Sequence, residues 1–216
     1  MYRGIAFDLD GTLVETSSEY RYSITRQTLD VFRVTATIAD IDRFWFESDK
    51  DGIIRACFNL EPDSFWPVYR RRDTGEARIP YTTVYPEVIN FLTDIKRAGY
   101  KIGIVTSAPD YIALPEIDLI GRDYFDSVIL AKRSFGIQPK PHPMGLEKCL
   151  RELGVNPADA VYVGNGREDV LMAQTAKVYD VLINRGENIA LEGLNPTLVI
   201  SSLDQLREML GNRNLF

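Results

Sequence analysis

The stretch GIAFDLDGTL, residues 4–13, decides the fold of this chain. Its first four residues form a short apolar run, and Asp10-Gly11-Thr12 has the composition of a tight turn. This pattern predicts a buried strand that ends at a loop carrying two aspartates, Asp8 and Asp10. A buried strand needs other elements on both of its faces, and the rest of the chain supplies them.

Beyond Pro86, short apolar runs alternate with segments of helical periodicity. The predicted strands are residues 101–107, 127–130, 160–164, 178–184 and 197–200, and the predicted helices are residues 86–98, 110–120, 143–153, 168–177 and 202–210. Strands that alternate with helices imply right-handed crossovers and a parallel sheet covered on both faces. The sequence therefore predicts the α/β class, with a doubly wound, Rossmann-like parallel-sheet core.

Residues 17–79 interrupt this alternation, and we expect them to form an insert after the first strand. Periodic apolar positions predict four short helices there, near residues 18–34, 38–47, 51–59 and 62–72. The expected organisation is a core domain of residues 1–16 and 80–216, with a small helical domain of residues 17–79. Segments near 13–17 and 79–85 then join the two parts as hinges.

The composition limits the classes of partner. The 216 residues are 45% hydrophobic and 26% charged, and 25 basic against 31 acidic side chains give a net charge of −6. An acidic chain is a poor match for nucleic acid, because phosphate backbones attract positive patches. The sequence has no run of roughly 18 apolar residues, the length that a membrane helix needs, and its first aspartates precede any signal-peptide pattern. We therefore expect a cytoplasmic protein with no nucleic-acid or membrane partner.

The two cysteines predict nothing beyond ordinary packing. Cys57 and Cys149 lie on apolar stripes at helical spacing, so we expect two buried, reduced thiols. The sequence has no paired cysteine motif and no cysteine–histidine cluster, which disfavours a structural zinc site.

Polar side chains follow the predicted strands at the edge where ligands bind in open α/β sheets. They are Asp8, Asp10, Thr106, Ser107, Lys140 in the loop QPKPHP, Asn165 and Asp169. Carboxylate and amide oxygens suit a hard divalent cation, while hydroxyls, loop amides and a lysine suit a phosphoryl group. The sequence therefore predicts a joint metal and phosphate site at this edge.

In this order and spacing, DLDGTL, IVTS, the lysine of KPHP and VYVGNGRED resemble the four motifs of the haloacid dehalogenase (HAD) superfamily. The helical insert resembles the C1 helical cap of its phosphoglycolate-phosphatase-like branch. The resemblance implies a cap domain over a HAD core and magnesium-dependent hydrolysis of a small phosphorylated metabolite through an aspartyl-phosphate. Shared motifs also leave phosphoryl transfer of the β-phosphoglucomutase kind open.

The resemblance assigns a role to each matching residue. Asp8 matches the nucleophile, and Asp10 matches the general acid and base. Thr106, Ser107 and Lys140 match the residues that bind the phosphoryl group. The implied cofactor is Mg²⁺, and its implied ligands are Asp8, the backbone carbonyl of Asp10, Asn165 and Asp169.

Asn165 departs from the family pattern, because an aspartate usually ligates magnesium at this place. The change removes one negative charge, and it leaves open a binding or regulatory protein built on a weakened HAD-like site. Lys50, the only lysine in residues 17–79, is the one candidate for the Schiff-base chemistry of a related cap.

Other charged residues have simpler interpretations. The run Arg70-Arg71-Arg72 either faces water at the end of a helix, which we favour, or clamps a second anionic group of the substrate. We expect His142 to be structural. The sequence favours neither a monomer nor a dimer.

Overall fold

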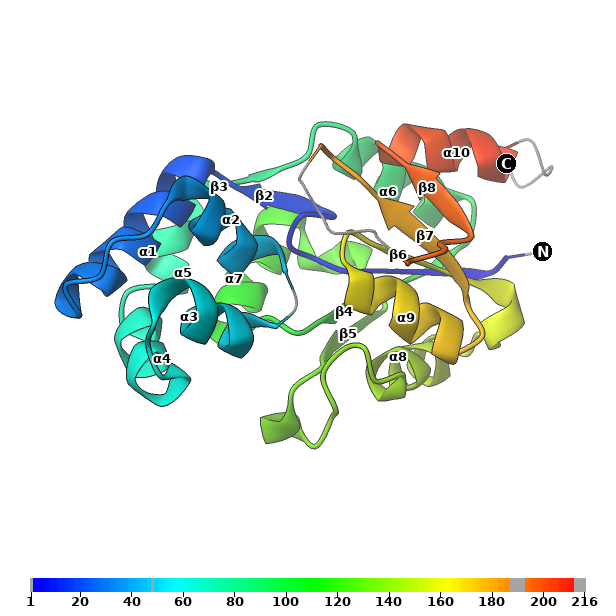
Figure 1. The fold of residues 1–216 in the computed structure, drawn as a ribbon. Coiled ribbons are helices and arrows are strands. Elements are labelled where there is room, and N and C mark those ends of the chain that lie inside the picture. The colour runs from blue at the N-terminus through cyan, green and yellow to red at the C-terminus, as the bar shows by residue number, and fades with distance from the viewer. Residues whose placement is uncertain (1, 48, 187–192, 212–216) are drawn as a thin grey trace.

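The first predicted strand, β1 (Gly4–Phe7), lies inside a six-stranded sheet (Figure 1). The structure is a computed structural model that describes residues 2–47, 49–186 and 193–211. The sheet has the order β5-β4-β1-β6-β7-β8, and all neighbouring pairs are parallel. The other strands are β4 (Lys101–Thr106), β5 (Ser127–Leu130), β6 (Ala160–Gly164), β7 (Tyr179–Ile183) and β8 (Leu198–Ile200).

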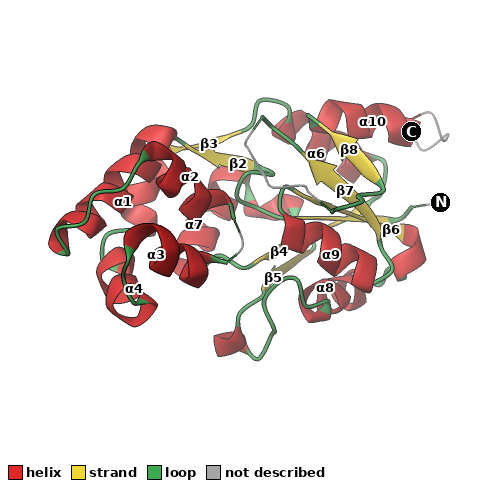
Figure 2. Ribbon diagram, viewed as in Figure 1, coloured by secondary structure: helices red, strands yellow, loops and turns green. Residues whose placement is uncertain are grey.

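Helices cover both faces of this sheet (Figure 2). On one face, α6 (Val88–Arg97), α7 (Asp110–Ile120) and α10 (Leu203–Gly211) form an apolar cluster with Ile5 and Phe7. On the other face, α8 (Met144–Leu153) and α9 (Arg167–Thr175) pack with Ala6. Side chains of alternate β1 residues thus point to opposite faces of the sheet, as the geometry of a strand requires. The predicted doubly wound α/β core is confirmed.

The insert contains the four predicted helices, namely α1 (Ser18–Val31), α2 (Ile38–Phe46), α3 (Lys50–Phe58) and α4 (Pro62–Arg70). Aromatic rings hold them together: the centroid of Phe44 in α2 lies 5.3 Å from that of Phe65 and 5.4 Å from that of Tyr69, both in α4. The first helix ends earlier than predicted, because Arg33 adopts the left-handed conformation (φ 56°) and turns the chain away from it.

Two short strands connect the insert to the core. β2 (Val14–Thr16) and β3 (Thr82–Val84) pair antiparallel, in the two segments that the sequence predicted as hinges. Before β3 lie two short helical segments that the sequence did not predict, α5 (Gly75–Arg78) and η1 (Ile79–Tyr81). A Cβ at Gly75 would collide with the backbone carbonyl of Tyr111 in α7, so α5 packs tightly on the core.

Small differences from the sequence prediction concern element ends and one thiol. The helix expected from Pro86 begins at Val88. Both cysteines are free, but the expectation of burial is correct only for Cys149. Cys57 is partly exposed, and its Sγ accepts a hydrogen bond from Nη1 of Arg43 at 3.3 Å.

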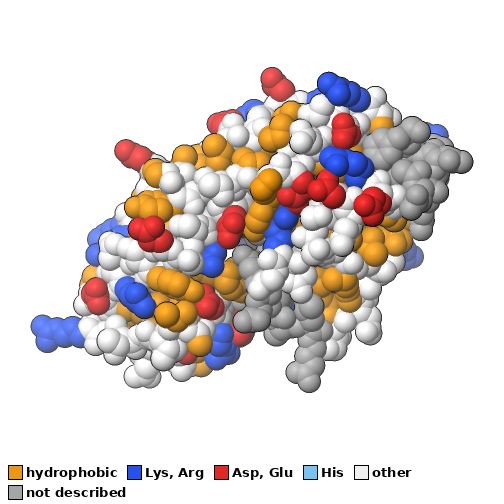
Figure 3. Space-filling view, turned by 90° about the horizontal axis from the view of Figure 1, so that it is seen from above, with side chains coloured by type: hydrophobic (Ala, Val, Ile, Leu, Met, Phe, Trp, Pro, Cys, Tyr) orange, Lys and Arg blue, Asp and Glu red, His pale blue; other side chains and the backbone are white. Residues whose placement is uncertain are grey.

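The surface and the helix lengths bear on possible partners. Acidic and basic side chains are interspersed over the face seen in Figure 3, unlike the basic field typical of a nucleic-acid-binding face. Among the residues that the structure describes, none of the helices combines the length and the apolar character needed to cross a bilayer.

Candidate active site

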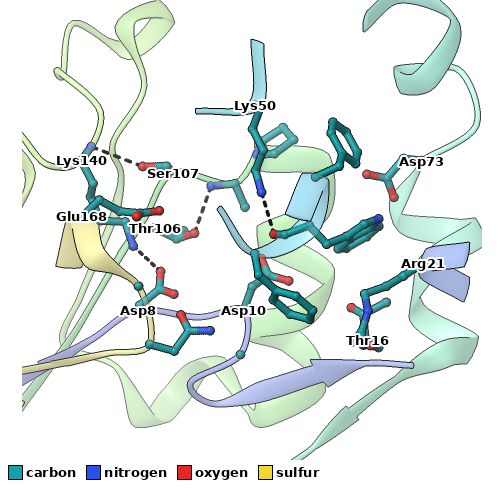
Figure 4. A pocket seen from close by; sticks show the side chains of 18 of the residues that line it. Asp8, Asp10, Thr16, Arg21, Lys50, Asp73, Thr106, Ser107, Lys140 and Glu168 are labelled. Atoms are coloured by element: carbon teal, nitrogen blue, oxygen red, sulfur yellow. Dashed lines mark hydrogen bonds and ion pairs between the residues drawn. The ribbon is translucent and has the colours of Figure 1, made fainter. Parts of the chain in front are cut away.

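A cavity of about 350 Å³ lies beyond the carboxyl ends of β1, β4 and β6, between the sheet and the helical insert (Figure 4). All seven side chains that the sequence predicted for the site line it, namely Asp8, Asp10, Thr106, Ser107, Lys140, Asn165 and Asp169. From the insert, Phe44, Trp45, Lys50, Trp66 and Tyr69 complete the wall. The parallel topology explains this convergence, because it brings the carboxyl ends of neighbouring strands to one edge.

Lys140 joins the loops after β1 and β6. Its ammonium Nζ donates to Oδ1 of Asp8 at 2.5 Å and to Oδ1 of Asp169 at 2.7 Å. All three side chains are less than a tenth exposed. The three groups therefore form a buried ion triad, in which one cation faces two carboxylates.

The triad has more negative than positive charge. Burial raises the pKa of Asp8 to about 7. The attraction of Lys140 lowers this pKa, and the repulsion from Asp169 raises it. Burial also acts to lower the pKa of Lys140, but the attraction of Asp169 and Asp8 outweighs it and raises the value. Lys140 thus stays protonated, and the carboxylates still lack a full balance of positive charge.

The loop after β4 supplies hydroxyl and amide groups. The Thr106 side chain is almost fully buried, and its Oγ1 accepts a hydrogen bond from the backbone N–H of Ala108 at 3.0 Å. The Ser107 Oγ accepts from the backbone N–H of Lys140 at 3.4 Å. These contacts connect the loop after β4 to the lysine loop, and both hydroxyls face the cavity that contains Asp8.

Asn165 and Asp169 are placed by the turn between β6 and α9. Oδ2 of Asp169 accepts the backbone N–H of Gly166 at 2.9 Å, so this carboxylate caps the start of α9 as well as binding Lys140. The amide end of Asn165 packs directly over Gly11, where any Cβ would collide with it. Gly11 has a φ of 72°, which also favours glycine.

The donors fit a hard divalent cation, although with one carboxylate fewer than the family pattern. Among residues 2–47, 49–186 and 193–211, no group of three or more His, Cys, Asp or Glu side chains is arranged to hold a metal. A cation bound here would therefore also need neutral oxygens, such as those of Asn165 and of the Asp10 backbone. The unbalanced buried charge of Asp8 and Asp169 favours a cation at this place, and oxygen donors suit magnesium.

The sequence missed two buried residues next to the site, Arg78 and Glu116. Arg78 in α5 binds Asp10 and forms an ion pair with Glu116, a fully buried acid of α7. Burial and the charge of Asp10 raise the pKa of Glu116 to about 9, although the attraction of Arg78 acts to lower it. Glu116 has a sequence signal, since it lies four residues from Ile112 and from Ile120 on the apolar stripe of α7.

Lys50 enters the cavity from the side opposite Asp8 and Asp10 (Figure 4). Its Nζ donates to the backbone carbonyl of Trp45 at 2.6 Å and lies 5.7 Å from the centroid of Phe44. Burial lowers the pKa of this amine to about 8. A cation therefore lies at the insert side of the cavity at neutral pH.

The other charged residues considered from the sequence lie outside the cavity. None of Arg70, Arg71 and Arg72 is among its lining residues. Arg70 is exposed and lies over the ring of Trp66, 5.3 Å from its centroid, which agrees with the favoured interpretation. His142 is exposed, and its Nδ1 accepts the backbone N–H of Met144 at 3.2 Å, a contact within its own loop.

The fold and this set of residues define a class of enzyme. The model of the haloacid dehalogenase-like hydrolase family matches residues 5–183, so the chain belongs to that family. The chain is 31% identical over 222 residues to phosphoglycolate phosphatase 1 of Pseudomonas aeruginosa, covering 96% of this chain and 78% of that protein.

Solved structures share the fold. A putative haloacid dehalogenase-like hydrolase from Bacteroides fragilis has a TM-score of 0.80 at 24% identity, covering 95% of this chain and 100% of that one. β-Phosphoglucomutase from Clostridium difficile has a TM-score of 0.70 at 18% identity, covering 100% and 97% of the two chains. Identities this low show the common fold alone, so the mutase alternative gains no specific support.

Proposed function

We propose that this hydrolase is a magnesium-dependent phosphatase of small phosphorylated metabolites, with phosphoglycolate as the representative substrate. The observation that carries the proposal is the buried triad, in which Lys140 Nζ lies 2.5 Å from Asp8 and 2.7 Å from Asp169. A cavity of about 350 Å³ is at the small end of ligand pockets and suits a small metabolite. The Pseudomonas aeruginosa relative, named for phosphoglycolate, supports the choice of substrate.

Asp8 and Asp10 share the chemistry in two steps. Asp8 attacks phosphorus, the bond from phosphorus to the leaving oxygen breaks, and Asp10 gives that oxygen its proton. Asp10 then takes a proton from the water that attacks the aspartyl-phosphate, which releases phosphate and restores Asp8. Two steps with a positioned acid and base have lower barriers than one direct hydrolysis.

The groups around Asp8 hold the phosphoryl oxygens. The Thr106 hydroxyl and the amides of its loop donate hydrogen bonds, and the Lys140 ammonium supplies a fixed positive charge. Asp8, the Asp10 carbonyl, Asn165 and Asp169 would hold the magnesium ion. Bound there, the ion would offset the repulsion between the Asp8 carboxylate and the phosphate dianion.

The insert completes the site as a cap. In this proposal residues 17–79 close over a core of residues 1–16 and 80–216, with β2 and β3 as the hinge. Lys50 then faces the end of the substrate remote from phosphorus, where phosphoglycolate carries a carboxylate. An aromatic wall beside this cation excludes water and strengthens the ion pair.

A panel of phosphate monoesters tests the proposal. Phosphate release is measured with and without Mg²⁺ for the wild-type protein and for Asp8→Asn, an isosteric change that removes the acceptor oxygen. We expect release from small alkyl phosphates, dependent on Mg²⁺ and absent in Asp8→Asn. If the wild-type protein binds phosphate esters and hydrolyses none of them, the alternative of a binding protein with a weakened HAD-like site replaces this proposal.

A further inference from the structure

A buried arginine that no motif of the sequence predicted contacts the proposed acid. The side chain of Arg78 is only 8% exposed, and its Nη2 donates to Oδ1 of Asp10. Its Nε donates to Oγ1 of Thr16 in the hinge strand β2 at 3.0 Å. Arg78 therefore connects the loop that carries Asp10 to the hinge between the core and the insert.

Contacts with α7 and β3 hold Arg78 in this place. Its helix, α5, packs on α7 at Gly75, where a side chain would collide with the backbone of α7. The backbone carbonyl of Arg78 accepts a hydrogen bond from Oγ1 of Thr82 in β3 at 3.1 Å. Glu116 of α7 is fully buried, and its Oε1 lies 3.3 Å from the Arg78 Nε. The guanidinium thus has a defined position before any substrate binds.

Asp10 needs such a partner more than Asp8 does. Its side chain is 34% exposed, whereas the Asp8 side chain is only 9% exposed, so surrounding protein restrains Asp10 less. Among the described residues, Arg78 is the side chain that holds the Asp10 carboxylate. A group that transfers a proton must be held within roughly 0.5 Å of its working position, and contacts from neighbouring residues provide that restraint.

We propose that Arg78 is a positioning residue for Asp10. The inference rests on the proposed function, in which Asp10 gives its proton to the leaving oxygen while the bond from Asp8 to phosphorus forms. Arg78 aims the Asp10 side chain at that oxygen and stabilises the carboxylate that remains when the proton has left. Such stabilisation acts on the transition state, where the charge develops.

Leaving groups of different basicity test this role. Phosphoglycolate releases a basic alkoxide that needs a proton, whereas p-nitrophenyl phosphate releases a weakly basic phenolate that needs none. In Arg78→Met we expect kcat/KM to fall about tenfold or more for phosphoglycolate and by less than about threefold for p-nitrophenyl phosphate. The ratio kcat/KM covers only the steps up to departure of the leaving group, so dephosphorylation does not enter the comparison.

Further variants keep the test independent of folding. Arg78→Lys keeps the positive charge, and we expect it to restore part of the alkyl activity. Arg70→Met, a matched change of an exposed arginine outside the cavity, should leave both esters unaffected.

Three results would overturn the inference. Equal losses for the two esters in Arg78→Met would mean that the arginine binds the phosphoryl group or only supports the fold. Wild-type rates for both esters would mean that Asp10 is held without it. A wild-type protein that hydrolyses neither ester would overturn the proposed function and this inference together, and that result is seen before any Arg78 variant is made.

Discussion

Replacement of Lys140 by methionine tests how strongly the buried triad depends on its single cation. The change removes the ammonium, keeps most of the side-chain volume, and leaves Asp8 and Asp169 facing each other away from water. Removing one partner of a buried ion pair costs about 3–5 kcal/mol, because the remaining charge is uncompensated. We expect a loss of this size in the free energy of unfolding at pH 8 with a chelator present.

Urea unfolding measures the loss. With a slope of roughly 2 kcal/mol per molar urea, the midpoint should fall by about 2 M. Lys148→Met is the matched control, because Lys148 forms an exposed ion pair with Glu152, and such pairs contribute about 0.5 kcal/mol or less. Both variants exchange a lysine for methionine, so any difference between them reports the surroundings of Lys140.

The stability loss of Lys140→Met should also depend on pH in a defined direction. The pKa of Asp8 is already raised to about 7 by burial, and loss of Lys140 removes the attraction that lowers it. The folded variant therefore binds a proton more readily than the unfolded chain does, so its stability falls as pH rises through the raised pKa. The deficit relative to wild type should be smaller at pH 5 than at pH 8. A deficit equal to that of Lys148→Met, or one that is the same at both pH values, would refute the account of the triad.

The remaining predictions concern activity. Asp8→Asn should abolish turnover and Asp10→Asn should lower kcat by about 10²–10⁴-fold, with unfolding midpoints checked by urea titration. Asn165→Asp adds a ligand charge, so the Mg²⁺ concentration for half-maximal activity should fall about tenfold; an unchanged Mg²⁺ titration would place residue 165 away from the metal. Lys50→Gln should raise KM about tenfold for phosphoglycolate but not for p-nitrophenyl phosphate. In the wild-type protein, the KM for phosphoglycolate should rise as the pH passes about 8, because burial lowers the pKa of Lys50 to that value. A KM that does not change with pH would contradict the role of Lys50 in binding the substrate carboxylate.

Local sequence patterns were sufficient to predict the strands of the sheet and the cavity residues that the core supplies. A strand followed by a polar turn is visible over about ten residues, as in residues 4–13, and each predicted site residue follows such a strand or its loop. The parallel topology then determines that these side chains meet, so no long-range information was needed. The order of the strands depends on packing between distant helices, and local patterns do not contain it.

The residues that link the insert to the core could be predicted only in part. Glu116 occupies the apolar face of α7, so a buried acid was detectable from its spacing. Arg78 was not detectable in this way, because its helix α5 has only four residues, too few to show a periodicity. Arg78 acquires its importance from Asp10, Thr16 and Glu116, three residues far from it in sequence. Such a cluster is visible only once the chain is folded.

Trapping the covalent intermediate tests whether Asp8 is the nucleophile. The wild-type protein is mixed with phosphoglycolate and Mg²⁺, quenched in acid during turnover, and treated with borohydride, which reduces an acyl phosphate to the alcohol. Peptide mass spectrometry then locates the reduced residue. We expect homoserine in place of Asp8, only when the ester is present, and none in Asp8→Asn. Phosphate release without any reduced aspartate, or with reduction at another residue, would contradict the assignment of Asp8 as the nucleophile.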